Sequence, residues 1–178
     1  CMAIFSAFLE RQGYAVQVLN SWEIYADAEA LMAHDLIVQS VTMSEITRDQ
    51  RKGLLTAVES GVGFAGWHGG IADAFRNSAS YNFMVGGQFV GHPGGVIDFD
   101  VRVDRPEDPV MAGLADFRVR TEQYYMHVDP RNEVLASTVF TGEHMPWVAG
   151  VEMPLVWKRT WGEGRVFVSA FGHQAAEF

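Results

Sequence analysis

Cysteine and long apolar runs are nearly absent from this sequence, and each absence excludes a class of protein. The only cysteine among the 178 residues is Cys1. A disulfide framework, a four-cysteine zinc site and an internal thiol nucleophile are therefore excluded. No stretch approaches the roughly 18 consecutive apolar residues that a membrane span requires, so we expect no membrane partner.

Positive charge is also scarce. The chain has 13 Lys and Arg against 22 Asp and Glu, which gives a formal net charge of −9. No basic stripe is visible, so we expect no nucleic-acid partner. The length fits one domain with a sizeable core, and a hydrophobic content of 48% with 20% charged residues is ordinary for a globular protein.

The first residues resemble the interior of a helix rather than the start of a protein. There is no initiator methionine, and residues 2–9 have helical spacing. We therefore expect a further segment ahead of Cys1. No signal-peptide pattern is present, and we take the cytoplasm as the default location.

The first half of the chain alternates between strand and helix patterns. Residues 14–19, 35–39 and 62–67 are predicted strands, and residues 26–33 are a predicted helix. A second helix is expected after Thr47, because Gln50 follows at the capping-box offset. This alternation favours a parallel sheet with helices on both faces. Further strands are predicted in the second half, at 96–103, 117–120, 133–138, 155–157 and 165–171, the last two being joined by a hairpin-like turn at 161–164.

The most informative segment is the apolar run of residues 62–67, which ends in His68-Gly69-Gly70. A strand that ends in a sharp glycine-rich turn can present one side chain at the carboxyl edge of a parallel sheet, where such sheets bind ligands. In several α/β families a serine or cysteine nucleophile occupies this place. His173 follows another apolar strand and a glycine, so the two imidazoles would share an edge if both strands are parallel. Two unrelated histidines at loop starts remain the alternative.

Two further segments contain candidate site residues. Residues 86–95 are predicted to form a glycine-dense loop that carries Gln88 and His92. The segment lacks the Gly-Lys-Ser/Thr of a phosphate loop. A simple turn-rich connection is the alternative. Glu122 and Tyr124 lie in an acidic and aromatic segment. A carboxylate beside imidazoles completes an acid–base pair or a metal site of the His/His/Glu type, whereas a solvated surface strand is the alternative. Trp67, next to His68, is the tryptophan expected nearest a pocket.

These motifs occur in an order that resembles the ThuA-like family, which is named for trehalose utilisation. The matching segments are 61–68, 86–93, 108–114, 122–124, 154–157 and 162–173. The resemblance covers roughly residue 13 to the end. It implies a class I glutamine amidotransferase-like fold, a flavodoxin-like three-layer α/β sandwich with a mostly parallel sheet. It also implies a single domain over residues 1–178 that lacks the family's N-terminal strand.

The resemblance also implies a role in disaccharide catabolism. In true amidotransferases the position of His68 holds the cysteine nucleophile and a late histidine, here His173, is its partner; without the thiol, glutamine hydrolysis through a thioester has no nucleophile. The substrate would be a trehalose-like or 3-keto sugar made by a partner oxidoreductase, and a second copy of the chain is among the partners that the sequence allows. Some relatives hold a metal through histidines and a glutamate, which implies a divalent ion such as zinc on His68, Glu122 and His173.

Three functions follow as hypotheses. The first is a sugar-processing enzyme of the lyase, isomerase or hydrolase class, in which His68, Glu122 and His173 act as acid–base groups or hold a divalent ion. The residues expected to bind its substrate are Trp67, Gln88, His92 and Tyr124. The second is a non-catalytic carbohydrate-binding or accessory subunit on the same scaffold. The third, residual amidotransferase or peptidase activity, requires a nucleophile that the chain does not offer.

Overall fold

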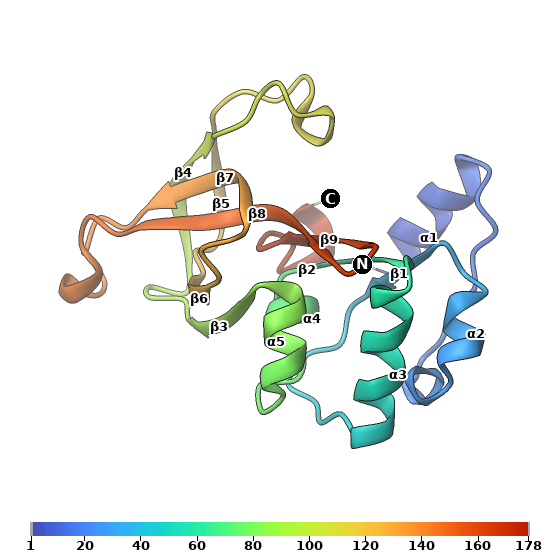
Figure 1. Cartoon of the computed structure of the whole chain (residues 1–178). Helices are drawn as coiled ribbons and strands as arrows, with labels where there is room; N and C mark the ends of the chain where they lie inside the picture. Colours follow the sequence, from blue (N-terminus) through green and yellow to red (C-terminus); the bar gives the residue numbers. More distant parts are fainter. Residues whose placement is uncertain (1, 178) are drawn as a thin grey trace.

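The structure is a computed structural model that describes residues 2–177. Its main feature is a curled sheet of seven strands in the order β1-β2-β9-β8-β7-β4-β5, beside a separate two-stranded sheet of β3 and β6. Figure 1 shows the helices gathered around one end of the large sheet, while β4, β5 and β7 curl away at the other. The strands are β1 (Leu36–Gln39), β2 (Gly63–Trp67), β3 (Gly87–Gly91), β4 (Val96–Val103), β5 (Phe117–Glu122), β6 (Tyr125–Val128), β7 (Glu133–Val139), β8 (Glu152–Trp161) and β9 (Gly164–Ser169).

The helices are short, and most of them lie in the first half of the chain. They are α1 (Met2–Arg11), α2 (Ala28–Met32), α3 (Arg48–Glu59), α4 (Gly69–Ala72) and α5 (Ala79–Val85), with 3₁₀ turns η1 (Glu23–Ala26), η2 (Pro109–Met111), η3 (Pro146–Val148) and η4 (Ala175–Glu177). Within residues 2–177, no helix is long and apolar enough to cross a membrane.

The expectation of a mostly parallel sheet is wrong. Only β1–β2 and β2–β9 pair in parallel; the four other pairings of the seven-stranded sheet are antiparallel. The physical reason lies in the connections. A parallel pair needs a long crossover, whereas a tight turn reverses the chain and makes its two strands antiparallel neighbours. The tight turn between Trp161 and Gly164, at the end of the predicted hairpin, joins β8 and β9 in this way.

The parallel part of the sheet has helices on both faces, as the alternation of elements predicts. Phe64 of β2 packs edge-on against Tyr81 of α5, with ring centroids 6.2 Å apart. Trp67, three residues later and therefore on the opposite face, stacks on Phe5 of α1 at 4.2 Å. Figure 1 accordingly shows α1 on one side of β2 and α3 and α5 on the other. The flavodoxin-like, three-layered description thus holds only for this end of the molecule.

Local signals explain where most of these elements begin and end. Thr47 caps α3 with the full capping box: its hydroxyl accepts from the Gln50 N–H, and the Gln50 side chain accepts from the Thr47 N–H. The predicted strands at 96–103, 117–120, 133–138 and 155–157 lie within observed strands. Those predicted at 35–39, 62–67 and 165–171 overlap β1, β2 and β9 over most of their length. The strand predicted at 14–19 is wrong. This segment has no assigned secondary structure, and most of its side chains are exposed. Alternation of apolar and polar residues is therefore not sufficient for a strand to form.

A buried polar cluster fixes the centre of the parallel region. The side-chain amide of Gln39 donates to the Gly70 carbonyl and to the Tyr81 hydroxyl, and its carbonyl accepts from the Tyr25 hydroxyl. The Tyr81 hydroxyl in turn donates to the Ile71 carbonyl at 3.0 Å. Buried polar groups are tolerated only when they are paired in this way. The cluster therefore holds β1, α4 and α5 in register directly beneath the residues that follow β2.

Candidate functional site

His68 stands in a strained backbone turn where β2 ends. Its φ of 50° and ψ of −144° lie in a region that residues with a Cβ rarely adopt. Its N–H donates to the Ser169 carbonyl of β9 at 2.6 Å, and its carbonyl accepts from the N–H groups of Ile71 and Ala72 in α4. The turn is therefore the strand-to-helix elbow that the glycine pattern predicts.

Glycine is required on both sides of this elbow because other groups approach the backbone closely. A Cβ on Gly66 would lie 2.8 Å from the Cβ of Ile71, and one on Gly70 would lie 2.8 Å from the Cα of Ser40. Real Cβ atoms do not make such contacts. The small residues thus allow β2, α4 and the end of β1 to pack closely together around the turn that carries His68.

One carboxylate, that of Glu122, faces three imidazoles. Its Oε2 is 3.1 Å from His68 Nε2 and 3.4 Å from His173 Nδ1, and its Oε1 is 3.7 Å from His92 Nε2. The rings of His68 and His173 have centroids 5.2 Å apart. Four side chains from four separate segments therefore meet at one point: the end of β2, the end of β5, the loop after β3 and the loop after β9.

The side chain of His68 forms a hydrogen bond with that of Tyr124. Its Nδ1 lies 2.9 Å from the Tyr124 hydroxyl in a buried hydrogen bond. Burial raises the pKa of Tyr124, and the charges of Glu122 and Asp73 raise it further. The phenol therefore stays protonated at neutral pH.

The other ring nitrogen of His68 is buried but has no hydrogen-bond partner within residues 2–177. It lies 3.1 Å from the Glu122 carboxylate, but the two atoms do not form a hydrogen bond. An unpaired buried nitrogen costs free energy, on the order of 1–3 kcal/mol. This nitrogen is therefore free to bind a further group beside the Glu122 carboxylate.

Burial lowers the pKa of His68 to about 4, with further lowering by His173 and His92. At neutral pH the ring is therefore neutral. A neutral imidazole whose Nδ1–H donates to the Tyr124 oxygen offers a lone pair at Nε2, which is the form that binds a metal.

The donor set fits a divalent ion. One ligand atom each from His68, Glu122 and His173 can be chosen so that all three lie within 4.8 Å of one another. Ligand atoms that share a zinc ion at about 2.0–2.2 Å are roughly 3.4 Å apart in tetrahedral geometry, which compares with the 3.1 and 3.4 Å between Glu122 and the two histidines. Two histidines and one glutamate are also the ligands of a known class of catalytic zinc site.

A carboxylate close to the end of the described residues supports the same centre. Glu177 in η4 accepts from the His173 N–H at 3.1 Å and from the Thr121 hydroxyl at 2.9 Å. Thr121 immediately precedes Glu122 in β5. The same carboxylate of Glu177 therefore holds the backbone of His173 and the side chain of Thr121 next to Glu122, a link that was not predicted from the sequence.

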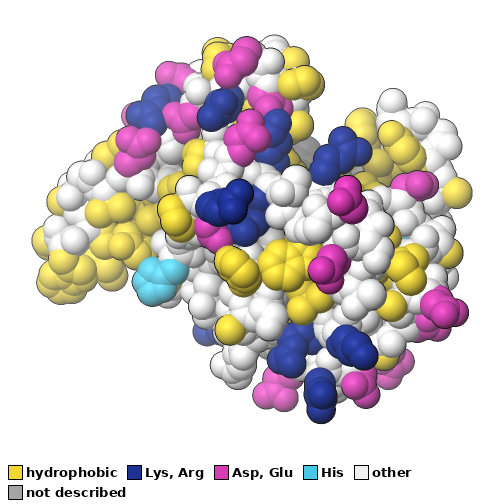
Figure 2. Space-filling view, viewed as in Figure 1, with side chains coloured by type: hydrophobic (Ala, Val, Ile, Leu, Met, Phe, Trp, Pro, Cys, Tyr) yellow, Lys and Arg dark blue, Asp and Glu magenta, His cyan; other side chains and the backbone are white. Residues whose placement is uncertain are grey.

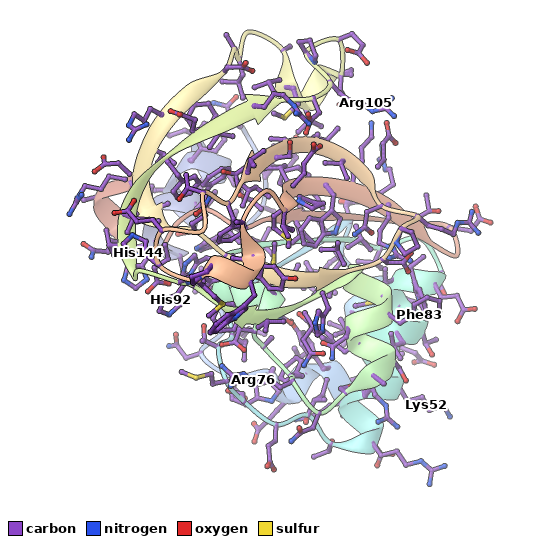
Figure 3. All side chains as sticks on the ribbon, turned by 90° about the vertical axis from the view of Figure 1, so that its left-hand side faces the viewer. Lys52, Arg76, Phe83, His92, Arg105 and His144 are labelled. Atoms are coloured by element: carbon purple, nitrogen blue, oxygen red, sulfur yellow. The ribbon has the colours of Figure 1, made fainter. Side chains whose placement is uncertain are left out.

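The structure places the other predicted site residues differently. His92 borders the centre with 40% of its side chain exposed, and in Figure 3 it lies on the side of the molecule that also carries His144 and Arg76. The Gln88 amide donates to the Arg76 carbonyl at 3.3 Å rather than to the centre. Trp67 is only 6% exposed and stacks on Phe5. The substrate-binding roles of Gln88 and Trp67 stay predictions.

Sequence reasoning missed a group of residues next to Tyr124. Asp73 is buried and holds the guanidinium of Arg76 through two hydrogen bonds. Arg76 lies over the ring of Phe89 at 5.7 Å, and Phe89 is 4.5 Å from Tyr124. The i, i+3 spacing of Asp73 and Arg76 was the one available signal for the pair; nothing in the sequence linked it to Tyr124.

Fold and site together define an α/β domain with a histidine–carboxylate centre at the carboxyl ends of its parallel strands. The chain belongs to the ThuA family, described as trehalose utilisation, whose family model matches residues 1–178. None of the curated proteins compared with it matches.

Solved structures share this fold at low sequence identity. A ThuA-like protein from Bacteroides uniformis ATCC 8492 has a TM-score of 0.81 at 21% identity, over 99% of this chain and 75% of that chain. A cytoplasmic protein from Salmonella typhimurium LT2 has a TM-score of 0.64 at 17% identity, over 93% of this chain and 74% of that one. A β-galactosidase from Rahnella sp. R3 has a TM-score of 0.61 at 19% identity, over 93% of this chain but 23% of the enzyme. At these identities the likeness concerns the fold alone.

Proposed function

We propose that this protein is a sugar-processing enzyme of disaccharide catabolism, acting on a trehalose-like or 3-keto disaccharide by metal-assisted or acid–base chemistry. The observation that carries the proposal is the contact of one carboxylate, Glu122, with the imidazoles of His68, His173 and His92. The family description, trehalose utilisation, supports the substrate class. The cytoplasm is the proposed location, and the Salmonella neighbour is described as a cytoplasmic protein.

Glutamine amidotransfer is not proposed. The elbow that carries a nucleophile in amidotransferases carries His68 here, and the only cysteine is Cys1. A thioester cannot form without a thiol. The strained elbow instead aims an imidazole at Glu122, which suits proton transfer or metal binding.

His68, Glu122 and His173 would hold a divalent ion such as zinc. When bound, such an ion acts as a Lewis acid that polarises a carbonyl or hydroxyl oxygen. Tyr124 orients His68 through Nδ1, and Glu177 holds the backbone of His173. Metal-binding histidines usually have such hydrogen-bonded support from neighbouring groups.

His92 is the residue best placed to move a proton to or from a substrate. Its side chain is 40% exposed, against 11% for His68 and 13% for Glu122, and its Nε2 faces Glu122 Oε1. A carbonyl on a 3-keto sugar acidifies the neighbouring C–H, and an imidazole or carboxylate at hydrogen-bond distance can accept that proton. In the proposed reaction His92 or Glu122 accepts this proton. The oxidoreductase that would supply a keto sugar stays a prediction.

Metal content and sugar turnover of the purified protein test the proposal together. We expect about one equivalent of zinc or another divalent ion, lost in Glu122→Gln and His173→Gln and kept in His127→Gln, whose exposed histidine lies in β6. Turnover of 3-keto-trehalose or trehalose should fall at least about 100-fold in the first two variants, the usual range for losing an acid–base or charge-stabilising group.

Two results would contradict the proposed enzyme. Unchanged turnover in Glu122→Gln would exclude the centre from the chemistry. Sugar binding by a metal-free protein, measured by calorimetry with no turnover of either disaccharide, would favour the alternative of a non-catalytic carbohydrate-binding subunit.

A further inference from the structure

A pocket outside the histidine–carboxylate centre is lined by several cationic side chains, and we call it the basic pocket. It has a volume of about 510 Å³ and lies between α5 and the end of the β8–β9 hairpin. The residues of interest in its lining are Phe83, Arg131, Lys158, Arg159, Trp161 and Arg165. In Figure 3, Phe83 is on the opposite side of the molecule from His92. The space-filling view in Figure 2 shows hydrophobic side chains near the middle of one face with Lys and Arg beside them.

The basic pocket concentrates positive charge in an acidic protein. Four of the 13 Lys and Arg of the chain line it, on a chain whose net charge is −9. Two of the four are compensated: Lys158 pairs with Asp108 and Glu133, and Arg159 pairs with Asp129. The other two, Arg131 and Arg165, are exposed and have no ion pair with any residue between 2 and 177.

Two buried donors in the pocket also lack partners. The side chain of Arg159 is 8% exposed, and its Nε–H has no hydrogen-bond partner within the described residues. The indole Nε1–H of Trp161 is buried and equally unpartnered. Both groups can only donate hydrogen bonds. Both groups are donors in the wall of the pocket, so they add to the positive potential that its cationic side chains create.

The pocket also offers an aromatic face. Phe83 on α5 is 59% exposed, and its ring packs edge-on against Trp161 at 5.5 Å. The Arg159 guanidinium lies 5.7 Å from the Phe83 ring centroid. An exposed phenylalanine beside arginines can contact the ring of a ligand whose charged group binds the guanidinium groups.

We propose that the basic pocket is a binding site for a small phosphate monoester that carries a ring. The phosphate oxygens would accept from the exposed guanidinium groups of Arg131 and Arg165, because guanidinium groups match phosphate geometry with paired N–H donors. The ring would pack on Phe83 near the Trp161 indole. A phosphate dianion supplies negative charge and several acceptors, whereas the one carboxylate in the lining, that of Glu133, pairs with Lys158.

Calorimetry on chelator-treated protein tests this site with phenyl phosphate as the probe. Chelation removes any metal that could itself bind phosphate at the Glu122 centre, so the result is independent of the proposed enzyme function. We expect binding of phenyl phosphate that weakens at least tenfold in Arg131→Gln/Arg165→Gln. Arg48→Gln, which removes an exposed arginine of α3 without an ion pair among residues 2–177, should leave the affinity unchanged.

A neutral analogue and a second variant make the outcome decisive. Phenyl glucoside, which has the ring but no phosphate, should not bind the basic pocket. Phe83→Ala should weaken phenyl phosphate while leaving inorganic phosphate unchanged. The site is refuted if phenyl phosphate does not bind at millimolar concentration, or if the double arginine variant binds it as well as the parent protein.

Discussion

The buried imidazole of His68 should make folding stability fall as the pH is lowered from 7 to 5. In the unfolded chain a histidine has a pKa of about 6.5, whereas burial lowers the pKa of His68 to about 4 in the folded protein. Between these values the unfolded state binds a proton that the folded state does not. The free energy of unfolding therefore decreases as the pH falls through this window, and the loss is complete below pH 4.

The magnitude follows from the two pKa values. Between pH 7 and pH 5, protonation of this single group lowers the free energy of unfolding by about 2 kcal/mol. His68 is 11% exposed at its side chain, so solvent screening reduces this figure little. Part of the lowering of the His68 pKa comes from the charges of His92 and His173.

Urea unfolding in the presence of a chelator measures the effect directly. The matched variant is His68→Asn, because asparagine tolerates a positive φ better than most residues and does not titrate. We expect the parent protein to lose about 2 kcal/mol more than the variant between pH 7 and pH 5. Equal losses in the two proteins would show that His68 is not held neutral by burial, and would remove the physical basis for an available Nε2.

Two further predictions concern the packing beneath the site. Gly66→Ala should destabilise the protein by about 1–3 kcal/mol, because the added Cβ would lie 2.8 Å from Ile71. Thermal unfolding should show a clear drop in the midpoint temperature of this variant. The control Gly91→Ala, where no atom lies within 4 Å of the new Cβ, should unfold close to the parent temperature. Tyr81→Phe should lower the free energy of unfolding by about 1–3 kcal/mol, because it leaves the buried Ile71 carbonyl unpaired. Chemical unfolding should show this loss. A loss equal to that of Tyr14→Phe, at an exposed position, would contradict the reasoning.

Sequence patterns were most reliable where the physical signal is local. The capping box at Thr47 and the hairpin turn before Gly164 each depend on residues within a few positions of one another. The elbow at His68 was equally accessible, since the glycines around it require close packing whatever the partner strand is. These signals located most of the strands and the single most informative histidine.

Errors arose where a pattern does not specify a partner. Alternation in residues 14–19 shows that a strand is feasible, but a strand forms only when its edge pairs, and in the structure this segment does not pair. Glycine density in residues 86–95 suggested a loop, yet residues 87–91 of this range form β3 and pair with β6. The strand predicted at 96–103 from its alternation is confirmed as β4, but nothing in that pattern indicates that β4 lies between β5 and β7.

The sequence by itself determined the composition limits, the family resemblance and the presence of a histidine in place of a thiol at the elbow. It also named His68, Glu122 and His173 as candidates. Only the tertiary structure decided that they meet, because His68 and His173 lie 105 positions apart in the numbering and Glu122 reaches them from an antiparallel strand at the far edge of a curled sheet. Convergence of this kind depends on long-range pairing and sheet curvature, which no local pattern encodes.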